Sequence, residues 1–243
     1  MIDIHSHILY GIDDGADNPR VSRRILRDSY DQGVDAMVAT PHFRKNMFET
    51  DIRQAVGRYK RVRHMARDIS EDFKIYLGAE VYFTSGVLNM LDRGLIPTMA
   101  GSDYVLVEFD YSIDYRTMKS NLSDIRQLGL RPILAHVERY FNVVTDLANI
   151  ENIIYLGGYI QVNATSVMKK QLFNDRHKIF KTRVRRLLDY DLVHFVASDV
   201  HNMTTRPSYM GEAYDWLEAT YGGDYAEELF VLNQEKILNN IIL

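Results

Sequence analysis

The chain has 243 residues, 46% of them hydrophobic, and its 29 basic and 33 acidic residues give a net charge of −4. This length suits a single domain over residues 1–243, and the charge gives no bulk basic excess that would favour nucleic acid or membrane. The sequence contains no cysteine, which excludes disulfides, thiolate metal sites and a cysteine nucleophile.

Strand-like apolar runs alternate with amphipathic helical runs along the chain. The expected strands are Ile2–Ile4, Ala36–Ala39, Ile75–Tyr82, Tyr104–Phe109, Pro132–Ala135, Tyr159–Val162 and His194–Ala197. Asn18 before Pro19 predicts one helix start, and Thr50 predicts another. Such alternation indicates an α/β protein with a mostly parallel sheet, and about seven strand–helix units favour a closed or distorted barrel over an open sheet.

No apolar stretch is long enough for a membrane-spanning helix, so we expect no membrane insertion. The first expected strand begins at Ile2, which leaves no room for a signal peptide and predicts a cytoplasmic protein.

Histidines and carboxylates lie at or near the ends of the expected strands. In chain order they are His5, His7, Asp14, His42, Glu80, Glu108, His136, Asp199 and His201. In a parallel barrel these positions share the C-terminal rim, where barrel active sites lie. A lone histidine at a strand end is usually an ordinary polar residue, but Glu80 and Glu108 within apolar strands are costly to bury unless paired or metal-bound.

Together these residues predict a metal site. They exceed the three or four protein ligands that one metal needs, so we expect two or three ions. Nitrogen and oxygen ligands with several carboxylates suit manganese, iron or zinc better than copper. The remaining histidines, His64, His177 and His194, are expected to be structural.

Two arginines follow predicted ligands. Arg139 comes three residues after His136, and Arg206 comes five residues after His201. Each has an alternative interpretation as a surface salt bridge, but guanidinium groups beside clustered metals suit a phosphate. We therefore expect metal-assisted phosphoester hydrolysis, in which a water shared by two metals supplies the attacking hydroxide. Asp199, His42 and His201 remain alternative candidates for a general acid.

Seven short motifs also carry a family resemblance. They are Asp3-Ile4-His5-Ser6-His7, Asp13-Asp14-Gly15, Thr40-Pro41-His42, Gly78-Ala79-Glu80, Ala135-His136-Val137-Glu138-Arg139-Tyr140, Gln161-Val162-Asn163 and Ser198-Asp199-Val200-His201-Asn202. In this order they resemble the PHP family, named for polymerase and histidinol phosphatase domains, and most closely its manganese-dependent protein-tyrosine phosphatases of bacterial capsule and exopolysaccharide biosynthesis. The resemblance implies a distorted (β/α)7 TIM-like barrel and hydrolysis of protein phosphotyrosine.

The resemblance also implies how the ligands are shared. One metal would be held by His5, His7, Glu80 and Asp199, a second by Glu80, Glu108 and His136, and a third by Asp14, His42 and His201. The implied substrate is the tyrosine-rich tail of an autophosphorylating bacterial tyrosine kinase that controls polysaccharide export.

Basic residues gather in three expected helices, around Arg20–Arg27, Arg58–Arg67 and Arg176–Arg186. They form either a solvated helix face or a docking surface for such a tail. The segment 44–48 is either a flap that contacts substrate or a stretch packed into the core. The rival functions are a small-molecule phosphatase, a nuclease-like phosphodiesterase and a non-enzymatic binding scaffold.

Overall fold

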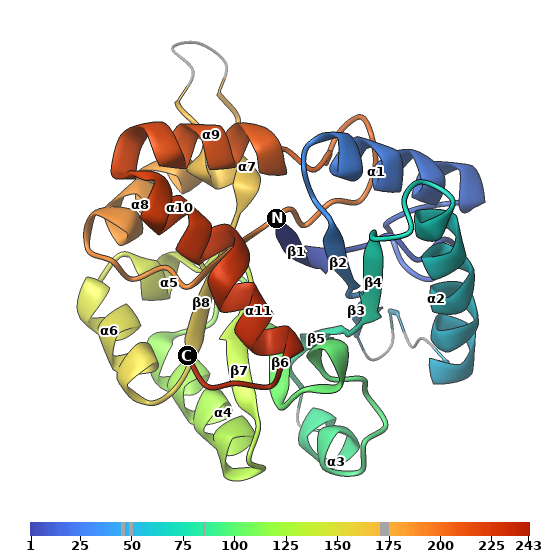
Figure 1. The fold of residues 1–243 in the computed structure, drawn as a ribbon. Coiled ribbons are helices and arrows are strands. Elements are labelled where there is room, and N and C mark those ends of the chain that lie inside the picture. The colour runs from blue at the N-terminus through green and yellow to red at the C-terminus, as the bar shows by residue number, and fades with distance from the viewer. Residues whose placement is uncertain (45–46, 49–50, 85, 171–174) are drawn as a thin grey trace.

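The computed structural model describes residues 1–44, 47–48, 51–84, 86–170 and 175–243. Their strands form a curled parallel sheet in two parts (Figure 1). The first part has the order β1-β2-β4, with β1 (Ile2–Ser6), β2 (Ala36–Ala39) and β4 (Lys74–Leu77). The second has the order β3-β5-β6-β7-β8-β9, with β3 (His42–Phe43), β5 (Glu80–Tyr82), β6 (Tyr104–Glu108), β7 (Arg131–Leu134), β8 (Tyr159–Asn163) and β9 (Phe195–Ala197).

The two parts of the sheet are joined at both sides. β2 runs through Pro41 into β3, and β4 runs through Gly78 and Ala79 into β5. On the far side, the segment after β9 returns to β1, where the Asp199 amide donates to the His5 carbonyl at 2.9 Å. The predicted α/β class with a parallel sheet is confirmed, and the exact count of seven strand–helix units stays a prediction.

Two strand predictions need correction. The single strand expected over 75–82 is interrupted at Gly78, where an added Cβ would lie only 3.0 Å from Met99 Sδ and 3.1 Å from Val38 Cγ1. The packing leaves little room for a side chain here, and the strand partner changes from β2 at β4 to β3 and β6 at β5. The short strand β3 was not predicted, because its two residues are too few to give an alternating pattern.

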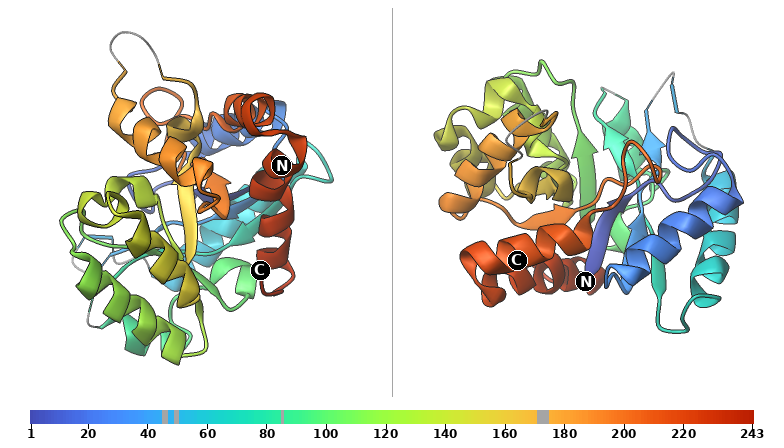
Figure 2. Two further views of the ribbon diagram at one scale, coloured as in Figure 1. Left: turned by 90° about the vertical axis from the view of Figure 1, so that its left-hand side faces the viewer. Right: turned by 90° about the horizontal axis from the view of Figure 1, so that it is seen from above.

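Helices surround the curled sheet (Figures 1 and 2). The α-helices are α1 (Pro19–Asp31), α2 (Ile52–Arg67), α3 (Val87–Asp92), α4 (Tyr115–Gln127), α5 (Phe141–Val144), α6 (Leu147–Tyr155), α7 (Ala164–Val167), α8 (Lys178–Asp189), α9 (Met210–Tyr221), α10 (Gly223–Glu227) and α11 (Asn233–Leu238). There are also two short 3₁₀ helices, η1 (Met99–Gly101) and η2 (Val137–Arg139), and one π-helix, η3 (Glu228–Leu232).

Helix starts follow local capping chemistry. Asn18 caps α1 as predicted, since its side chain accepts from the amides of Arg20 and Val21, and Pro19 stands at the first helical position. The N-cap of α2 is Asp51, whose side chain accepts from the Arg53 amide. Thr50, the predicted cap, lies outside the described residues.

The core is divided by the sheet. Successive residues of a strand face opposite sides. Accordingly Ile2 and Ile4 of β1 belong to one buried cluster with Ile237 of α11, whereas Met37 and Ala39 of β2 belong to a larger cluster with the helices. No helix in the described part of the chain is long and apolar enough to span a membrane.

Several basic side chains of the helices have partners within the molecule. Arg23 Nη2 lies 3.0 Å from Asp68 Oδ2. Lys181 is 5% exposed, and its Nζ atom lies 3.2 Å from Asp175 Oδ2. The Arg185 guanidinium lies 3.8 Å from the centroid of a Trp216 ring. These basic runs are therefore only partly available to a partner.

In the segment 44–48, residues 45–46 lie outside the described residues. Met47 is 58% exposed, so the alternative that Met47 packs into the core is wrong.

Candidate metal centre

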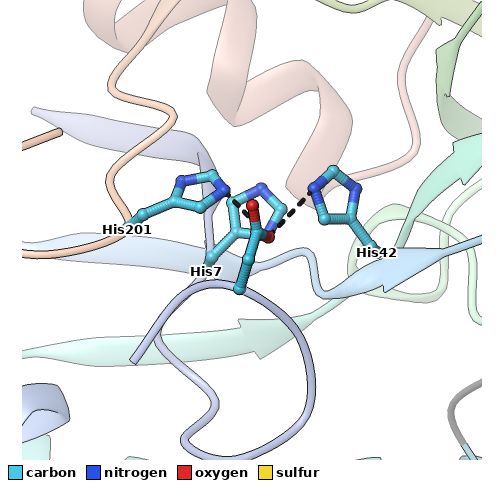
Figure 3. A group of neighbouring side chains, drawn as sticks. His7, His42 and His201 are labelled. Atoms are coloured by element: carbon cyan, nitrogen blue, oxygen red, sulfur yellow. Dashed lines mark ion pairs between the residues drawn. The ribbon is translucent and has the colours of Figure 1, made fainter. Parts of the chain in front are cut away.

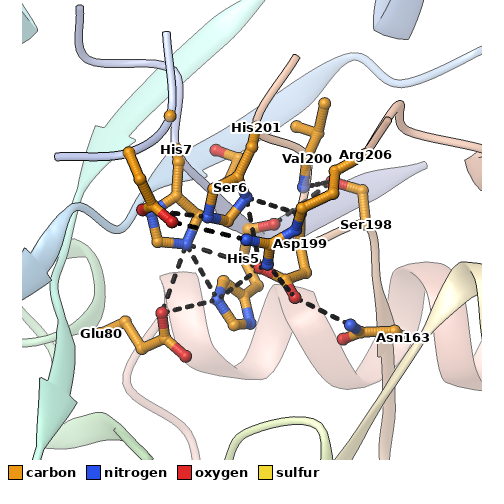
Figure 4. Close-up of polar contacts among 12 residues, drawn as sticks. His5, Ser6, His7, Glu80, Asn163, Ser198, Asp199, Val200, His201 and Arg206 are labelled. Atoms are coloured by element: carbon orange, nitrogen blue, oxygen red, sulfur yellow. Dashed lines mark hydrogen bonds and ion pairs between the residues drawn. The ribbon is translucent and has the colours of Figure 1, made fainter. Parts of the chain in front are cut away.

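The predicted ligands lie close together at the carboxyl ends of the strands, and Figure 4 shows His5, His7, Glu80, Asp199 and His201 among them. His5 and Glu108 lie on β1 and β6, His42 and Glu80 begin β3 and β5, and the others stand in the following loops. All are buried except His42, which is half-buried, and Asp14, whose side chain is 50% exposed. The sheet thus gathers side chains that are far apart in sequence.

Glu80 lies at the middle of this cluster. Its Oε2 atom is 3.3 Å from the Nε2 atoms of both His5 and His7, and 2.9 Å from His42 Nδ1. Its Oε1 atom is 2.8 Å from His136 Nε2. Both carboxylate oxygens of Glu80 thus lie next to imidazole nitrogens that could bind metal.

Two further carboxylates flank Glu80. Glu108 Oε2 lies 3.4 Å from His136 Nε2. On the other side, Asp14 Oδ1 lies 3.3 Å from His42 Nε2 and 3.4 Å from His201 Nε2. Figure 3 shows the rings of His7, His42 and His201 close together, and the centroids of the His7 and His201 rings are 3.8 Å apart.

The donor set fits divalent cations. Three groups have potential ligand atoms within 4.8 Å of one another: His7 with Asp14, His42 and His201; His5 with His7 and Glu80; and His42 with Glu80 and Glu108. Glu80 Oε2 and His201 Nε2 are buried and make ion-pair contacts, 2.9 Å to His42 Nδ1 and 3.4 Å to Asp14 Oδ1, but neither makes a hydrogen bond of good geometry among the described residues. Buried polar atoms without well-formed hydrogen bonds are costly, and coordination of a cation would remove that cost.

Asp199 connects the cluster to the two predicted arginines. Its Oδ1 atom lies 3.5 Å from the Nε2 atoms of His5 and His7. Arg139 and Arg206 both donate to its carboxylate, Arg206 Nη2 at 2.8 Å from Oδ2. The arginines therefore lie at the pocket, with a buried carboxylate as their partner rather than a surface one.

Electrostatics keep the central carboxylates ionised. Burial raises the pKa of Glu80, but the charges of His5 and His42 outweigh it and hold that pKa well below the usual value. Burial likewise raises the pKa of Asp199, and the charges of Arg139, His5, Arg206 and His201 hold it well below the usual value. Both side chains are therefore anionic at neutral pH, the form that binds metal.

The histidines divide into two protonation states. Burial and the charge of His7 lower the pKa of His201 to about 4, so this imidazole is neutral. Burial lowers the pKa of His42, but the charge of Glu80 and a hydrogen bond with Asp14 outweigh it and raise the pKa to about 11. A cation bound there would displace that proton, since ligand binding requires neutral imidazole.

Two candidate ligands stand in strained backbone. His136 has φ 34° and ψ 56°, and Asp199 has φ 54°, both in the left-handed region that favours glycine. Such conformations cost about 1–3 kcal/mol each and are found where the surroundings enforce them, often at active sites. Here the His136 amide donates to Gln161 Oε1 at 2.8 Å, and the Asp199 amide donates to the His5 carbonyl.

Asp13 holds two ligands in place, a role that sequence reasoning missed. Its Oδ2 atom lies 2.8 Å from His7 Nδ1 and accepts from the His42 amide at 2.9 Å. With its proton on Nδ1, His7 presents the lone pair of Nε2 to the pocket. The following Gly15 is required by space, because an added Cβ would lie 2.3 Å from the His7 carbonyl oxygen.

The side-chain carboxamides of Gln161 and Asn163 on β8 form a second supporting chain of hydrogen bonds, here called the β8 relay. Gln161 Oε1 accepts from the His136 amide at 2.8 Å and lies 3.3 Å from His5 Nδ1. Gln161 Nε2 then donates to Asn163 Oδ1 at 3.0 Å, and Asn163 Nδ2 donates to Asp199 Oδ2 at 2.8 Å. Through these two side chains of one strand, the β8 relay contacts three candidate ligands: His5, His136 and Asp199. The motif Gln161-Val162-Asn163 was visible in the sequence, but its partners were not.

Asp3 is a further buried carboxylate of the first motif, and it has no place among the candidate ligands. It accepts from both the amide (3.0 Å) and the hydroxyl (2.6 Å) of Ser198, and burial raises its pKa. Asp3 therefore ties β1 to the loop that carries Asp199.

The three histidines predicted to be structural lie outside the ligand groups. His64 is exposed on α2, and His177 is exposed at the start of α8. His194 accepts at Nδ1 from the Ile160 amide at 3.2 Å.

The fold and the donor set are those of an α/β protein with a candidate multi-metal centre at its strand ends. The chain belongs to the capsular polysaccharide synthesis family CpsB/CapC, whose family model matches residues 1–239. It is 42% identical over 238 residues to the tyrosine-protein phosphatase CpsB of Streptococcus pneumoniae, and the match covers 98% of each chain. It is 29% identical to the tyrosine-protein phosphatase YwqE of Bacillus subtilis (strain 168) over 245 residues, covering 99% of this chain and 92% of that protein.

A solved structure gives the same result. It comes from work on YwqE of Bacillus subtilis and CpsB of Streptococcus pneumoniae, described as unique metal-dependent tyrosine phosphatases. It superimposes with a TM-score of 0.88 at 27% identity, covering 99% of this chain and 95% of that chain. The resemblance predicted from the seven motifs is thereby confirmed.

Proposed function

We propose that this protein hydrolyses protein phosphotyrosine with manganese as its resident metal. The observation that supports this best is the convergence of four imidazoles on the Glu80 carboxylate, with Asp199 and two arginines beside it. Family membership and the names of the relatives point to the same activity. Iron or zinc are alternative occupants, since both accept the same nitrogen and oxygen ligands.

We propose the ligand partition that the resemblance implies. His5, His7, Glu80 and Asp199 would hold one ion, Glu80 with Glu108 and His136 a second, and Asp14 with His42 and His201 a third. The short distances from Glu80 to His5 and His136 support a bridging role for this carboxylate. His7 and His42 each belong to two of the distance groups, so the three sites would be contiguous.

Bound ions would supply a Lewis acid and a water of lowered pKa. The chain's own residues would orient the phosphate. Arg139 and Arg206 approach from one side of the pocket, where their guanidinium groups can hold the non-bridging oxygens and stabilise charge that develops on them. When the P–O bond of phosphotyrosine breaks, tyrosine leaves as a phenolate, whose conjugate acid has a pKa of about 10, so general acid help from His42, His201 or Asp199 is less needed.

For the substrate we propose a bacterial tyrosine kinase with a phosphorylated tyrosine-rich tail, met in the cytoplasm. Membership of the capsular polysaccharide synthesis family supports a phosphoprotein of that pathway. We also propose that the chain is one domain, in which β2–β3 and β4–β5 each count as one interrupted strand of a seven-stranded barrel.

A phosphatase assay tests the proposal. Purified protein is treated with EDTA, dialysed, and assayed on a phosphotyrosine peptide and on an alkyl phosphate with and without added manganese. We expect turnover of the peptide to disappear with EDTA, return with manganese, and exceed that of the alkyl phosphate. A variant of the exposed His64, His64→Ala, serves as control. Turnover that resists the chelator would rule out metal dependence, and faster turnover of the alkyl phosphate would favour the small-molecule phosphatase.

A further inference from the structure

A slot of about 100 Å³ opens beside the candidate metal centre, lined by Arg44, Tyr82, Glu108, Phe109, Asp110 and Tyr111. These residues stand at or just beyond the ends of β3, β5 and β6, which are neighbours in the sheet. Of them, Glu108 alone belongs to the proposed metal ligands. The other lining residues have no part in holding metal or phosphate in the proposed function.

The slot, here called the Tyr82–Tyr111 slot, adjoins the reaction site at two points. One is Glu108, whose Oε2 atom lies 3.4 Å from His136 Nε2. The other is Tyr111, whose hydroxyl accepts from Arg139 Nη1 at 3.2 Å. A group that fills the slot is therefore next to a phosphate held by Arg139.

Three of the six lining residues are aromatic and three are charged, and several have contacts of their own. The Arg44 guanidinium lies 4.0 Å from the centroid of the Tyr82 ring, and the Tyr82 hydroxyl donates to Asp110 at 3.5 Å. The Phe109 amide donates to the Tyr140 hydroxyl at 3.1 Å. These contacts hold the Tyr82 ring and the Phe109 backbone in place without a ligand.

We propose that the Tyr82–Tyr111 slot receives the phenyl ring of the phosphotyrosyl group and selects aryl phosphates over alkyl phosphates. The inference rests on the proposed function, which places phosphate beside Arg139. An apolar cavity of about 150 Å³ encloses a whole benzene, so the slot of about 100 Å³ takes most of a phenyl ring rather than all of it. Aromatic and cation–π contacts with Tyr82, Tyr111 and Arg44 would stabilise the ring, whereas the short side chain of phosphoserine would not reach them.

The test measures binding rather than turnover. Manganese-loaded protein is titrated by calorimetry with phenylphosphonate and, separately, with methylphosphonate. We expect the wild type to prefer the phenyl compound by roughly tenfold. Tyr82→Ala should lose most of that preference while its affinity for methylphosphonate stays unchanged, which also shows that the variant is folded. Tyr82→Phe should keep the preference, and Tyr190→Ala, at a 62% exposed tyrosine outside the slot, serves as control.

Equal affinity of the wild type for both phosphonates would overturn the inference. So would a loss in Tyr82→Ala that is the same for both compounds, because that result places the effect on the phosphate. A phenyl preference that depends on Tyr82, in a protein without phosphotyrosine turnover, would support the slot and refute the proposed function. The role of the slot and the phosphotyrosine phosphatase activity can therefore be tested separately.

Discussion

Replacement of Gln161 by leucine removes the start of the β8 relay without changing the size of the side chain greatly. Three buried groups lose their partner: the His136 amide, the proton on His5 Nδ1 and Asn163 Oδ1. At about 1 kcal/mol or more for each unsatisfied group, the free energy of unfolding should fall by roughly 3 kcal/mol. Because the relay orients His5, His136 and Asp199, manganese affinity should fall about 10- to 100-fold.

The control is a second buried glutamine, Gln234, whose side-chain amide donates to the carbonyls of Val196 and Leu229. Gln234→Leu should also lower stability but leave the metal affinity unchanged. Urea unfolding of the metal-free proteins gives the first quantity, and calorimetric titration with manganese gives the second. If the two variants bind manganese equally well, Gln161 is a structural residue and its positioning role is refuted.

Three further outcomes are expected. Arg139→Ala should keep its metal content but lose about 2–4 kcal/mol of transition-state stabilisation in kcat/KM on a phosphotyrosine peptide, and wild-type rates would remove Arg139 from the mechanism. His136→Ala should lose metal as well as rate, by elemental analysis, and full metal content would exclude it as a ligand. Burial lowers the pKa of His194 to about 4, below the unfolded value, so the unfolded chain binds a proton that the native chain does not. The free energy of unfolding should therefore fall between about pH 6.5 and pH 4, by up to about 3 kcal/mol. His194→Asn, which keeps an acceptor for the Ile160 amide, should lose this component. An unchanged pH slope in that variant would refute the assignment.

Local chemistry made much of the fold predictable. Asn18 and Pro19 carry the signal for α1 in two adjacent residues, and the structure shows that cap. The apolar strands were also predictable, because each carries its signal in a few consecutive residues. The break at Gly78 was not, because the strand partner changes there from β2 to β3 and β6, and pairing with strands elsewhere in the chain leaves no local signal.

The candidate site was likewise predictable only in part: its ligands were predicted, but the residues that support them were not. His5, Glu80 and Asp199 were found because imidazoles and buried carboxylates at strand ends are unusual without a metal. Supporting residues such as Asp13 and Gln161 are of ordinary types. Their roles arise from contacts between residues far apart in the chain, such as His5 and Gln161, whose positions differ by 156, and sequence spacing does not reveal such contacts.

Metal analysis shows whether Glu80 holds more than one cation, as the proposed function requires. Protein loaded with manganese and freed of excess is analysed for metal per chain, beside Glu80→Gln, which keeps the size of the side chain but removes its charge. We expect two or three manganese ions per wild-type chain and the loss of at least one in the variant. A wild-type protein that hydrolyses phosphotyrosine with no bound metal would rule out the metal centre, and a variant with full metal content would rule out Glu80 as a shared ligand.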